Sequence, residues 1–123
     1  MTAELILDAR NATGESPVWS VAEQALYWVD IPARRLHRWQ AADGFSQSWE
    51  APQMLACIAR GSDGHWIGAM ESGVFTLTPQ TDGRLSHQED IWTRGDYPRT
   101  LTLDTQGQWL YVMNQRSDNI TRF

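Results

Sequence analysis

The stretch GESPVWSVAEQALYWVDI, residues 14–31, decides the fold class of this chain. Two apolar runs, PVW and ALYWVDI, are rich in the aromatic and β-branched residues that strands prefer, and a short polar segment joins them. A single carboxylate, Glu15, stands just before the first run. The pattern predicts a β-hairpin whose leading carboxylate either binds a ligand or only marks the end of a strand.

The same pattern continues along the chain, and helical periodicity is almost absent. Turn sequences such as Asp43-Gly44, Asp63-Gly64 and Asp82-Gly83 supply residues that tolerate the positive φ of tight turns. The chain is therefore expected to be all-β and to form one domain. Twelve short strands are predicted, at residues 4–7, 17–20, 25–31, 35–40, 47–51, 55–60, 66–70, 74–78, 85–89, 100–104, 109–114 and 119–123.

An internal repeat becomes visible when three apolar segments are aligned: ALYWVD (25–30), WIGAME (66–71) and WLYVMN (109–114). Repeats of about 40 to 45 residues with four strands each are typical of β-propeller blades. We therefore expect blades at about residues 14–52, 54–90 and 97–123, with residues 3–8 supplying the outer strand of the third blade.

The repeat gives equivalent positions to residues far apart in the chain. Glu15, Ala56 and Arg99 each precede an innermost strand. In such a position Glu15 could be a ligand of a divalent cation, since hard cations prefer oxygen ligands. A salt bridge with Arg99 is the alternative, because buried charges are usually paired.

Asp30, Glu71 and Asn114 occupy a second set of equivalent positions, at the ends of the second strands. Side chains of this kind often cap turns by bonding to nearby backbone groups. They are also candidates for the lining of the central channel. Asp30 and Glu71 are the candidate catalytic bases, and Arg99 and Asn114 are candidate substrate contacts.

Composition narrows the functional classes. The net charge of −5 disfavours a nucleic-acid or anionic-membrane surface, which needs a basic footprint. The single cysteine, Cys57, excludes an intrachain disulfide and suggests a buried thiol. No signal peptide pattern or long apolar run is present, so a soluble, cytoplasmic protein is expected. The seven tryptophans indicate packing between blades, with a sugar-stacking platform as the alternative.

The segment GESPVWSVAEQALYWVDIPARRLHRW resembles the opening blade of the gluconolactonase family that includes senescence marker protein 30 (regucalcin). That family has a Gly-Glu-Gly-Pro-x-Trp motif followed by Leu-Tyr-Trp-Val-Asp-Ile, and the similarity extends more loosely over about residues 3–90. The resemblance implies a six-bladed propeller and a metal-dependent lactone hydrolase in which Glu15 is one metal ligand, for Ca²⁺, Zn²⁺ or Mn²⁺. The family's Arg-x-Asn-Asp-Gly substrate motif is replaced here by Tyr97-Pro98-Arg99-Thr100, and its other ligands are not matched.

The tail from Asp96 to Phe123 is instead similar to a late blade of the seven-bladed 6-phosphogluconolactonase-like family. It carries a Pro-Arg-x-x-x-Leu-Asp pattern followed by Val-x-Asn-Gln-x-Ser-Asp-Asn. This second resemblance implies two propeller fragments joined near Asp90, either a natural fusion or an engineered chimera.

Three blades leave two sheet faces open, so two chains on a two-fold axis are expected to close a six-bladed ring as a homodimer. The N-terminal strand would then complete the last blade of its own chain or of its partner. Two functions follow from the sequence: a sugar lactone hydrolase or a catalytically impaired remnant of one, and a non-catalytic, self-associating propeller module.

Overall fold

The computed structural model of the chain describes residues 1–61 and 64–123, with residues 89 and 90 described by their backbone alone. Strands and no helices form within this part of the chain, which confirms the predicted all-β class. The strands are β1 Gly14–Ser20, β2 Ala25–Asp30, β3 Arg35–Gln40, β4 Ser46–Glu50, β5 Leu55–Arg60, β6 Trp66–Met70, β7 Gly73–Pro79, β8 Leu85–Ile91, β9 Pro98–Leu103, β10 Leu110–Asn114 and β11 Asn119–Arg122.

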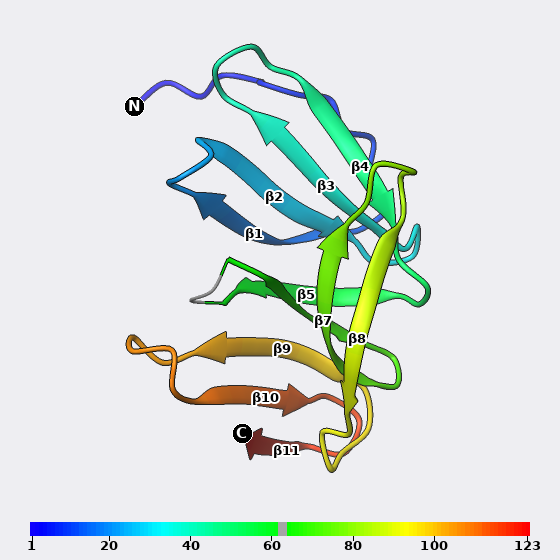
Figure 1. The fold of residues 1–123 in the computed structure, drawn as a ribbon. Coiled ribbons are helices and arrows are strands. Elements are labelled where there is room, and N and C mark those ends of the chain that lie inside the picture. Colours follow the sequence, from blue (N-terminus) through cyan, green and yellow to red (C-terminus); the bar gives the residue numbers. More distant parts are fainter. Residues whose placement is uncertain (62–63) are drawn as a thin grey trace.

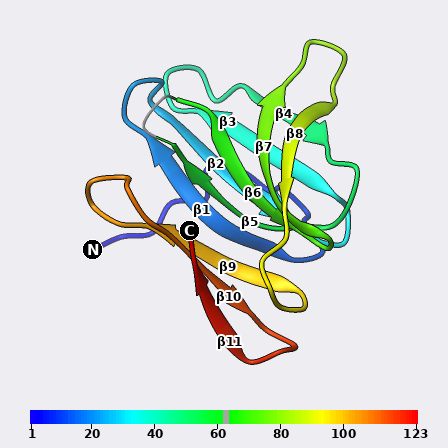
Figure 2. The same ribbon diagram turned by 60° about the horizontal axis from the view of Figure 1, so that its bottom comes forward.

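The strands form three antiparallel sheets that follow one another along the chain (Figure 1). We call them blade one (β1–β4), blade two (β5–β8) and blade three (β9–β11). Each is a simple meander, because every strand pairs with the next one in sequence. Figure 2 shows the first strands β1, β5 and β9 lying side by side, as the inner strands of a propeller do, with β4 and β8 farther out.

Glycines with a positive φ, in the left-handed region of backbone conformation, allow the hairpin turns to be tight. Gly44, Gly83 and Gly107 have φ values of 72°, 82° and 68°, which cost glycine little and other residues more. Two of them belong to the Asp-Gly pairs from which turns were predicted. The turn predicted at Asp63-Gly64 includes residues 62 and 63, which lie outside the described part of the chain.

Successive side chains of a strand point to opposite faces of the sheet, and in these sheets both faces carry apolar side chains. One face of blade one packs against blade two in a core that includes Tyr27, Leu36, Trp49, Trp66 and Leu77. The opposite face of blade two packs against blade three, in a second core built from Cys57, Ala69, Val74, Leu101 and Val112. Blade two is therefore covered on both sides by its neighbours.

The tryptophans take part in this packing in two ways. Trp49 and Trp66 are buried between blades one and two, as the packing interpretation predicts. Trp28 and Trp39 lie on the outward face of blade one, where they share a small cavity with Ile6 of the N-terminal segment. Trp28 also donates its indole N–H to Asn11 Oδ1 at 2.7 Å.

The N-terminal segment departs from the prediction. Residues 4–7 form no strand, and blade three has three strands within this chain, without a fourth from the N-terminus. The segment runs instead along blade one (Figure 1), with Ile6, Leu7 and Ala9 against its outward apolar face. The physical reason is that this face has no neighbouring sheet in the chain, so a nearby apolar segment covers part of it.

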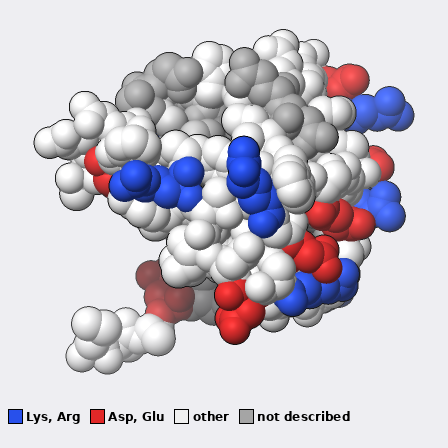
Figure 3. Space-filling view, turned by 90° about the horizontal axis from the view of Figure 1, so that it is seen from below, with Lys and Arg blue, Asp and Glu red and all other residues white. Residues whose placement is uncertain are grey.

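Charged residues do not form a field of one sign on the side of the molecule shown in Figure 3. Arginines and acidic residues alternate there around broad uncharged surface. Among the described residues, no helix is long and apolar enough to cross a membrane.

The close packing of side chains within blade two makes a prediction about Gly68, in the middle of β6. A methyl group on Gly68 would run into the Cδ1 atoms of Leu77 and Leu55, both fully buried. We expect Gly68→Ala to lower the free energy of unfolding by about 1–3 kcal/mol through overpacking. Urea denaturation measures this, with Gln106→Ala in an exposed turn as a control that changes stability by less than about 0.5 kcal/mol. An unchanged midpoint in Gly68→Ala would show that the two leucines have room to move.

Candidate functional site

The carboxylate of the opening motif forms an ion pair inside the chain. Nη2 of Arg99 donates to Oε1 of Glu15 at 2.6 Å, and the two side chains are 31% and 37% exposed. Glu15 begins blade one and Arg99 begins blade three, so the pair crosses the start of blade two. The predicted salt bridge is therefore present, and it joins blades one and three of the same chain.

A β-bulge positions Glu15. The pairing of β1 with β2 is regular up to Val18 and shifts between Val18 and Glu15. Ser16, within the bulge, has a φ of 56°, a conformation that an L-residue adopts at a cost. Its hydroxyl accepts the N–H of Ile58 at 3.0 Å and so ties the bulge to blade two. No sequence signal points to this role, because a serine before a proline is common in many contexts.

Blade two has no polar residue at the position that corresponds to Glu15. Glu15 pairs with Val29, and at the same point of blade two Leu55 pairs with Met70. The register therefore makes Leu55, and not Ala56 as predicted, the counterpart of Glu15. Leu55 is apolar and fully buried, so this position of blade two supplies no second carboxylate beside Glu15.

Asp30 fastens the loop that leads into blade one. Its Oδ2 accepts the N–H of Ala12 at 3.0 Å, and its Oδ1 accepts the N–H of Thr13 at 3.1 Å. Burial acts to raise the pKa of Asp30, but the hydrogen bonds from Thr13, Ala12 and Asn11 outweigh it, so the pKa lies below its ordinary value. A carboxylate with a low pKa and occupied oxygens is poorly suited to accept a proton at neutral pH.

Glu71 has a similar role in blade two. Its Oε1 accepts the N–H of Met54 at 3.1 Å, immediately before β5 begins. The side chain is exposed on the surface. Both residues predicted as catalytic bases thus bond to the backbone of the loop that precedes the first strand of their own blade.

Asn114 completes the set in blade three. It is buried, accepts the hydroxyl of Thr93 at 2.7 Å and donates to Asn119 Oδ1 at 2.9 Å. Thr93 lies in the segment before β9. The three equivalent residues therefore share one structural role, the turn-capping alternative that the sequence left open.

A cavity of about 700 Å³ brings the two predicted substrate contacts together. Arg99 and Asn114 both line it, with Thr100, Met113 and Ile120. It lies on the outward face of blade three, where Met113 and Ile120 are 40% and 68% exposed. Asp30 and Glu71 do not line this cavity.

Cys57 lies near the Glu15–Arg99 ion pair, but its environment does not suit a catalytic nucleophile. The thiol is buried in the core between blades two and three. Burial raises its pKa to about 12, despite hydrogen bonds with the backbone of Leu101 and Ala69. Since the thiolate is the reactive form, this side chain is inert near neutral pH.

A divalent cation does not fit the groups that the chain places around Glu15. A cation site needs several oxygen ligands, and here a positively charged guanidinium occupies the carboxylate. No group of three or more His, Cys, Asp or Glu side chains is arranged to hold a metal in the part of the chain that the structure describes. Metal binding at Glu15 would require that Arg99 move away and that further ligands come from outside the described residues.

Comparison with known proteins identifies a family and individual relatives of this chain. A family model described as "SMP-30/Gluconolactonase/LRE-like region" matches residues 13–123 and so continues through the tail beyond Asp90. The chain is 41% identical over 76 residues to 6-deoxy-6-sulfogluconolactonase of Pseudomonas putida, covering 62% of this chain and 26% of that protein. It is also 41% identical over 61 residues to L-arabinolactonase of Azospirillum brasilense, covering 50% and 20%.

Solved structures show the same fold. The periplasmic gluconolactonase of Pseudomonas aeruginosa superposes with a TM-score of 0.65 at 17% identity, covering 92% of this chain and 36% of that one. The likeness confirms the predicted propeller architecture. The chain spans about a quarter of the length of the curated relatives it matches.

The hydrogen bonds of Asp30 make a prediction about stability and pH. A carboxylate with a lowered pKa stabilises the fold fully above its unfolded value, and this contribution is lost as the pH falls through the folded value. Asp30→Asn should therefore lower the free energy of unfolding by about 1–3 kcal/mol at pH 7 and flatten its decline below about pH 4. Denaturant unfolding at several pH values tests this, with exposed Asp43→Asn as control. Equal pH profiles for wild type and Asp30→Asn would contradict the assigned role.

Proposed function

The chain belongs to the SMP-30/gluconolactonase/LRE-like family, and we propose that it is a sugar lactone hydrolase or a catalytically impaired remnant of one. The names of its relatives, a sulfogluconolactonase and an arabinolactonase, support this class of substrate. The observation that carries the proposal is the Glu15–Arg99 pair at the start of the inner strands. It provides a partly exposed cation and a partly exposed anion at the place where the family's opening motif lies.

The chemistry of lactone hydrolysis suits such a pair. Water attacks the carbonyl carbon, negative charge develops on the carbonyl oxygen, and the ring oxygen leaves as an alcohol. Arg99 has N–H groups beyond the one that it donates to Glu15, and these can stabilise the developing charge. Glu15 is the carboxylate beside it that can accept the proton of the attacking water.

The proposal has a second, metal-dependent form, in which the hydrolase requires Ca²⁺, Zn²⁺ or Mn²⁺. In that form Glu15 would be one ligand of the cation after Arg99 has moved away, and the cation would supply positive charge for the carbonyl oxygen. Asp30 or Glu71 would then be the base, although each is bonded to the backbone in the present arrangement. The two forms differ in one measurable property, the effect of a chelator.

Hydrolysis of glucono-δ-lactone and L-arabinono-γ-lactone, followed by acid release, tests the proposal. We expect Glu15→Gln and Arg99→Gln each to lower kcat/KM by roughly 10²-fold, because a catalytic group is lost or displaced. Glu50→Gln on the outer strand β4 is the matched control and should keep full activity. Assays with EDTA and with each added metal distinguish the two forms. Absence of turnover under every condition would end the hydrolase proposal.

A second candidate function, a self-associating propeller module, rests on the open faces of blades one and three. Met113 and Ile120 are exposed on blade three, and Trp19 and Val21 are exposed on blade one. Apolar patches of this kind favour association. Two chains on a two-fold axis would cover both faces and give six blades. The N-terminal segment would then leave blade one and pair with the last blade of either chain.

The mass in solution tests this second candidate. We expect light scattering to give about twice the chain mass of 14.0 kDa, and Ile120→Glu to reduce it to the monomer by placing a charge in the interface. Asn119→Asp, a polar change next to it in β11, serves as the control for added charge. A monomeric wild type that melts cooperatively would rule out the closed ring.

A further inference from the structure

A second cavity lies between blades one and two, at the ends of the inner strands opposite Glu15. It has a volume of about 440 Å³, and its walls come from both blades. Glu23 in the turn after β1 and Arg60 at the end of β5 contribute to it, whereas Glu15 lies at the start of β1. At about 3.3 Å per residue the two sites are separated by roughly 15 Å. Since both walls belong to this chain, the cavity does not depend on any further blade.

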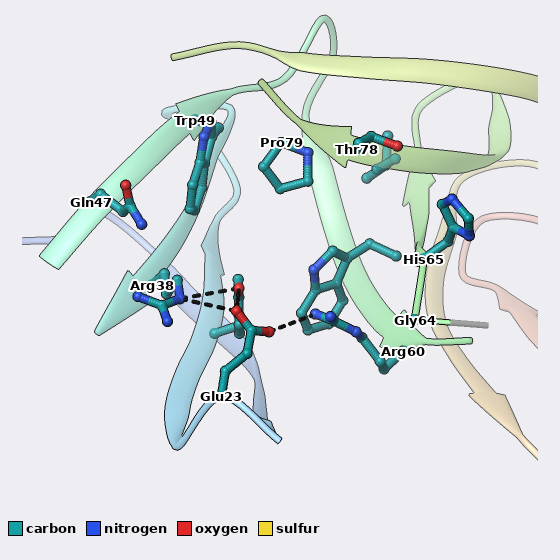
Figure 4. Close-up of a pocket in the computed structure, with 12 residues that line it drawn as sticks. Glu23, Arg38, Gln47, Trp49, Arg60, Gly64, His65, Thr78 and Pro79 are labelled. Carbon is teal, nitrogen blue, oxygen red and sulfur yellow. Dashed lines mark hydrogen bonds and ion pairs between the residues drawn. The ribbon is translucent and has the colours of Figure 1, made fainter. Parts of the chain in front are cut away.

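Two arginines converge on one glutamate in this cavity (Figure 4). Oε1 of Glu23 lies 3.5 Å from Nε of Arg38, and Oε2 lies 3.2 Å from Nη1 of Arg60. The hydroxyl of Tyr27 donates to Glu23 at 2.9 Å and accepts from Arg38 at 3.2 Å. Glu23 and Tyr27 thus fix two guanidinium groups beside one cavity, and positive charge exceeds negative charge among these residues.

The guanidinium of Arg60 is held so that donors remain available. It lies over the ring of Trp66, 4.5 Å from the centroid, which orients its plane. Nη1 is buried, and its distance to Glu23 is that of an ion pair without hydrogen-bond geometry; among the described residues it has no hydrogen-bond partner. A buried donor in this state gains free energy from an acceptor that enters the cavity.

The rest of the wall suits a small hydroxylated ligand. Figure 4 shows Trp49, Pro79 and Thr78 around the hollow above Glu23, with Gln47 at its edge. The indole N–H of Trp49 already donates to the backbone of Gln80 at 3.1 Å, so its ring presents an apolar surface. The volume lies in the range of about 300–1,000 Å³ that small-molecule sites occupy.

We propose that this cavity binds a small organic anion, a carboxylate or phosphate ester of about the size of a sugar acid. The fork of N–H groups on Arg60 and the guanidinium of Arg38 recognise the oxyanion, and Gln47 and Thr78 accept or donate to hydroxyl groups. Trp49 packs against the carbon chain. The site is distinct from the Glu15–Arg99 pair, so it stands whether or not the chain hydrolyses lactones.

The experiment is a titration followed by the indole N–H signals of Trp49 and Trp66 in two-dimensional NMR spectra. Gluconate and inorganic phosphate are the anionic probes, and glucose is the neutral control. We expect saturable shifts with at least one anion and none with glucose, and the tighter anion identifies the headgroup. Linear shifts without saturation, or equal shifts with glucose, would overturn the proposal.

Three variants sharpen the test. Arg60→Gln should weaken anion binding about tenfold or more, because a charged hydrogen bond is lost. Glu23→Gln keeps an oxygen that accepts the Tyr27 hydrogen bond but loses the competing negative charge, so it should strengthen binding about fivefold, an outcome that a merely unfolded variant cannot produce. Arg122→Gln is the matched control, since Arg122 also lies over a tryptophan ring, that of Trp109 at 4.2 Å, but does not line this cavity. Weaker binding in Glu23→Gln, or an equal loss in Arg122→Gln, would contradict the assignment.

Discussion

Each sheet of this protein has two apolar faces, and each face needs a neighbouring surface to exclude water. Blade two satisfies this condition on both sides, because Leu36 and Trp49 lie against one face and Leu101 and Val112 lie against the other. The strong packing at this centre explains why β6 has a glycine, Gly68, where a side chain would collide with two leucines. The outward faces of blades one and three have no neighbouring sheet in the part of the chain that the structure describes.

The segments that precede the first strand of each blade are held in place by hydrogen bonds. Asp30, Glu71 and Asn114 each end a second strand and bond to the segment before the first strand of the same blade. The same kind of hydrogen bond occurs in all three blades, although an aspartate, a glutamate and an asparagine make it. Its effect is to fix the start of the inner strands, where Glu15 and Arg99 meet. Residues that looked like catalytic candidates therefore support the site through the backbone.

The pairing of Glu15 with Arg99 argues against the interpretation of Glu15 as a simple metal ligand. One carboxylate with a guanidinium 2.6 Å away has its charge already compensated. A cation must compete with Arg99 and find other oxygen ligands. The ion pair also links blade one to blade three directly across blade two, so the same contact contributes to the arrangement of the blades and to the chemistry proposed for them.

The sequence by itself determined the all-β class, the order of the strands from β1 to β11, the three-blade repeat and the family, because alternation, turn residues and the opening motif are local patterns. It also placed Glu15 and Arg99 at equivalent positions, which made their pairing predictable. Only the tertiary structure decided that the pair forms within one chain, that residues 4–7 cover blade one, and that Glu23, Arg38 and Arg60 surround a cavity. Those outcomes depend on which apolar face lacks a neighbour and on contacts between residues far apart in the chain, and no local pattern carries that information.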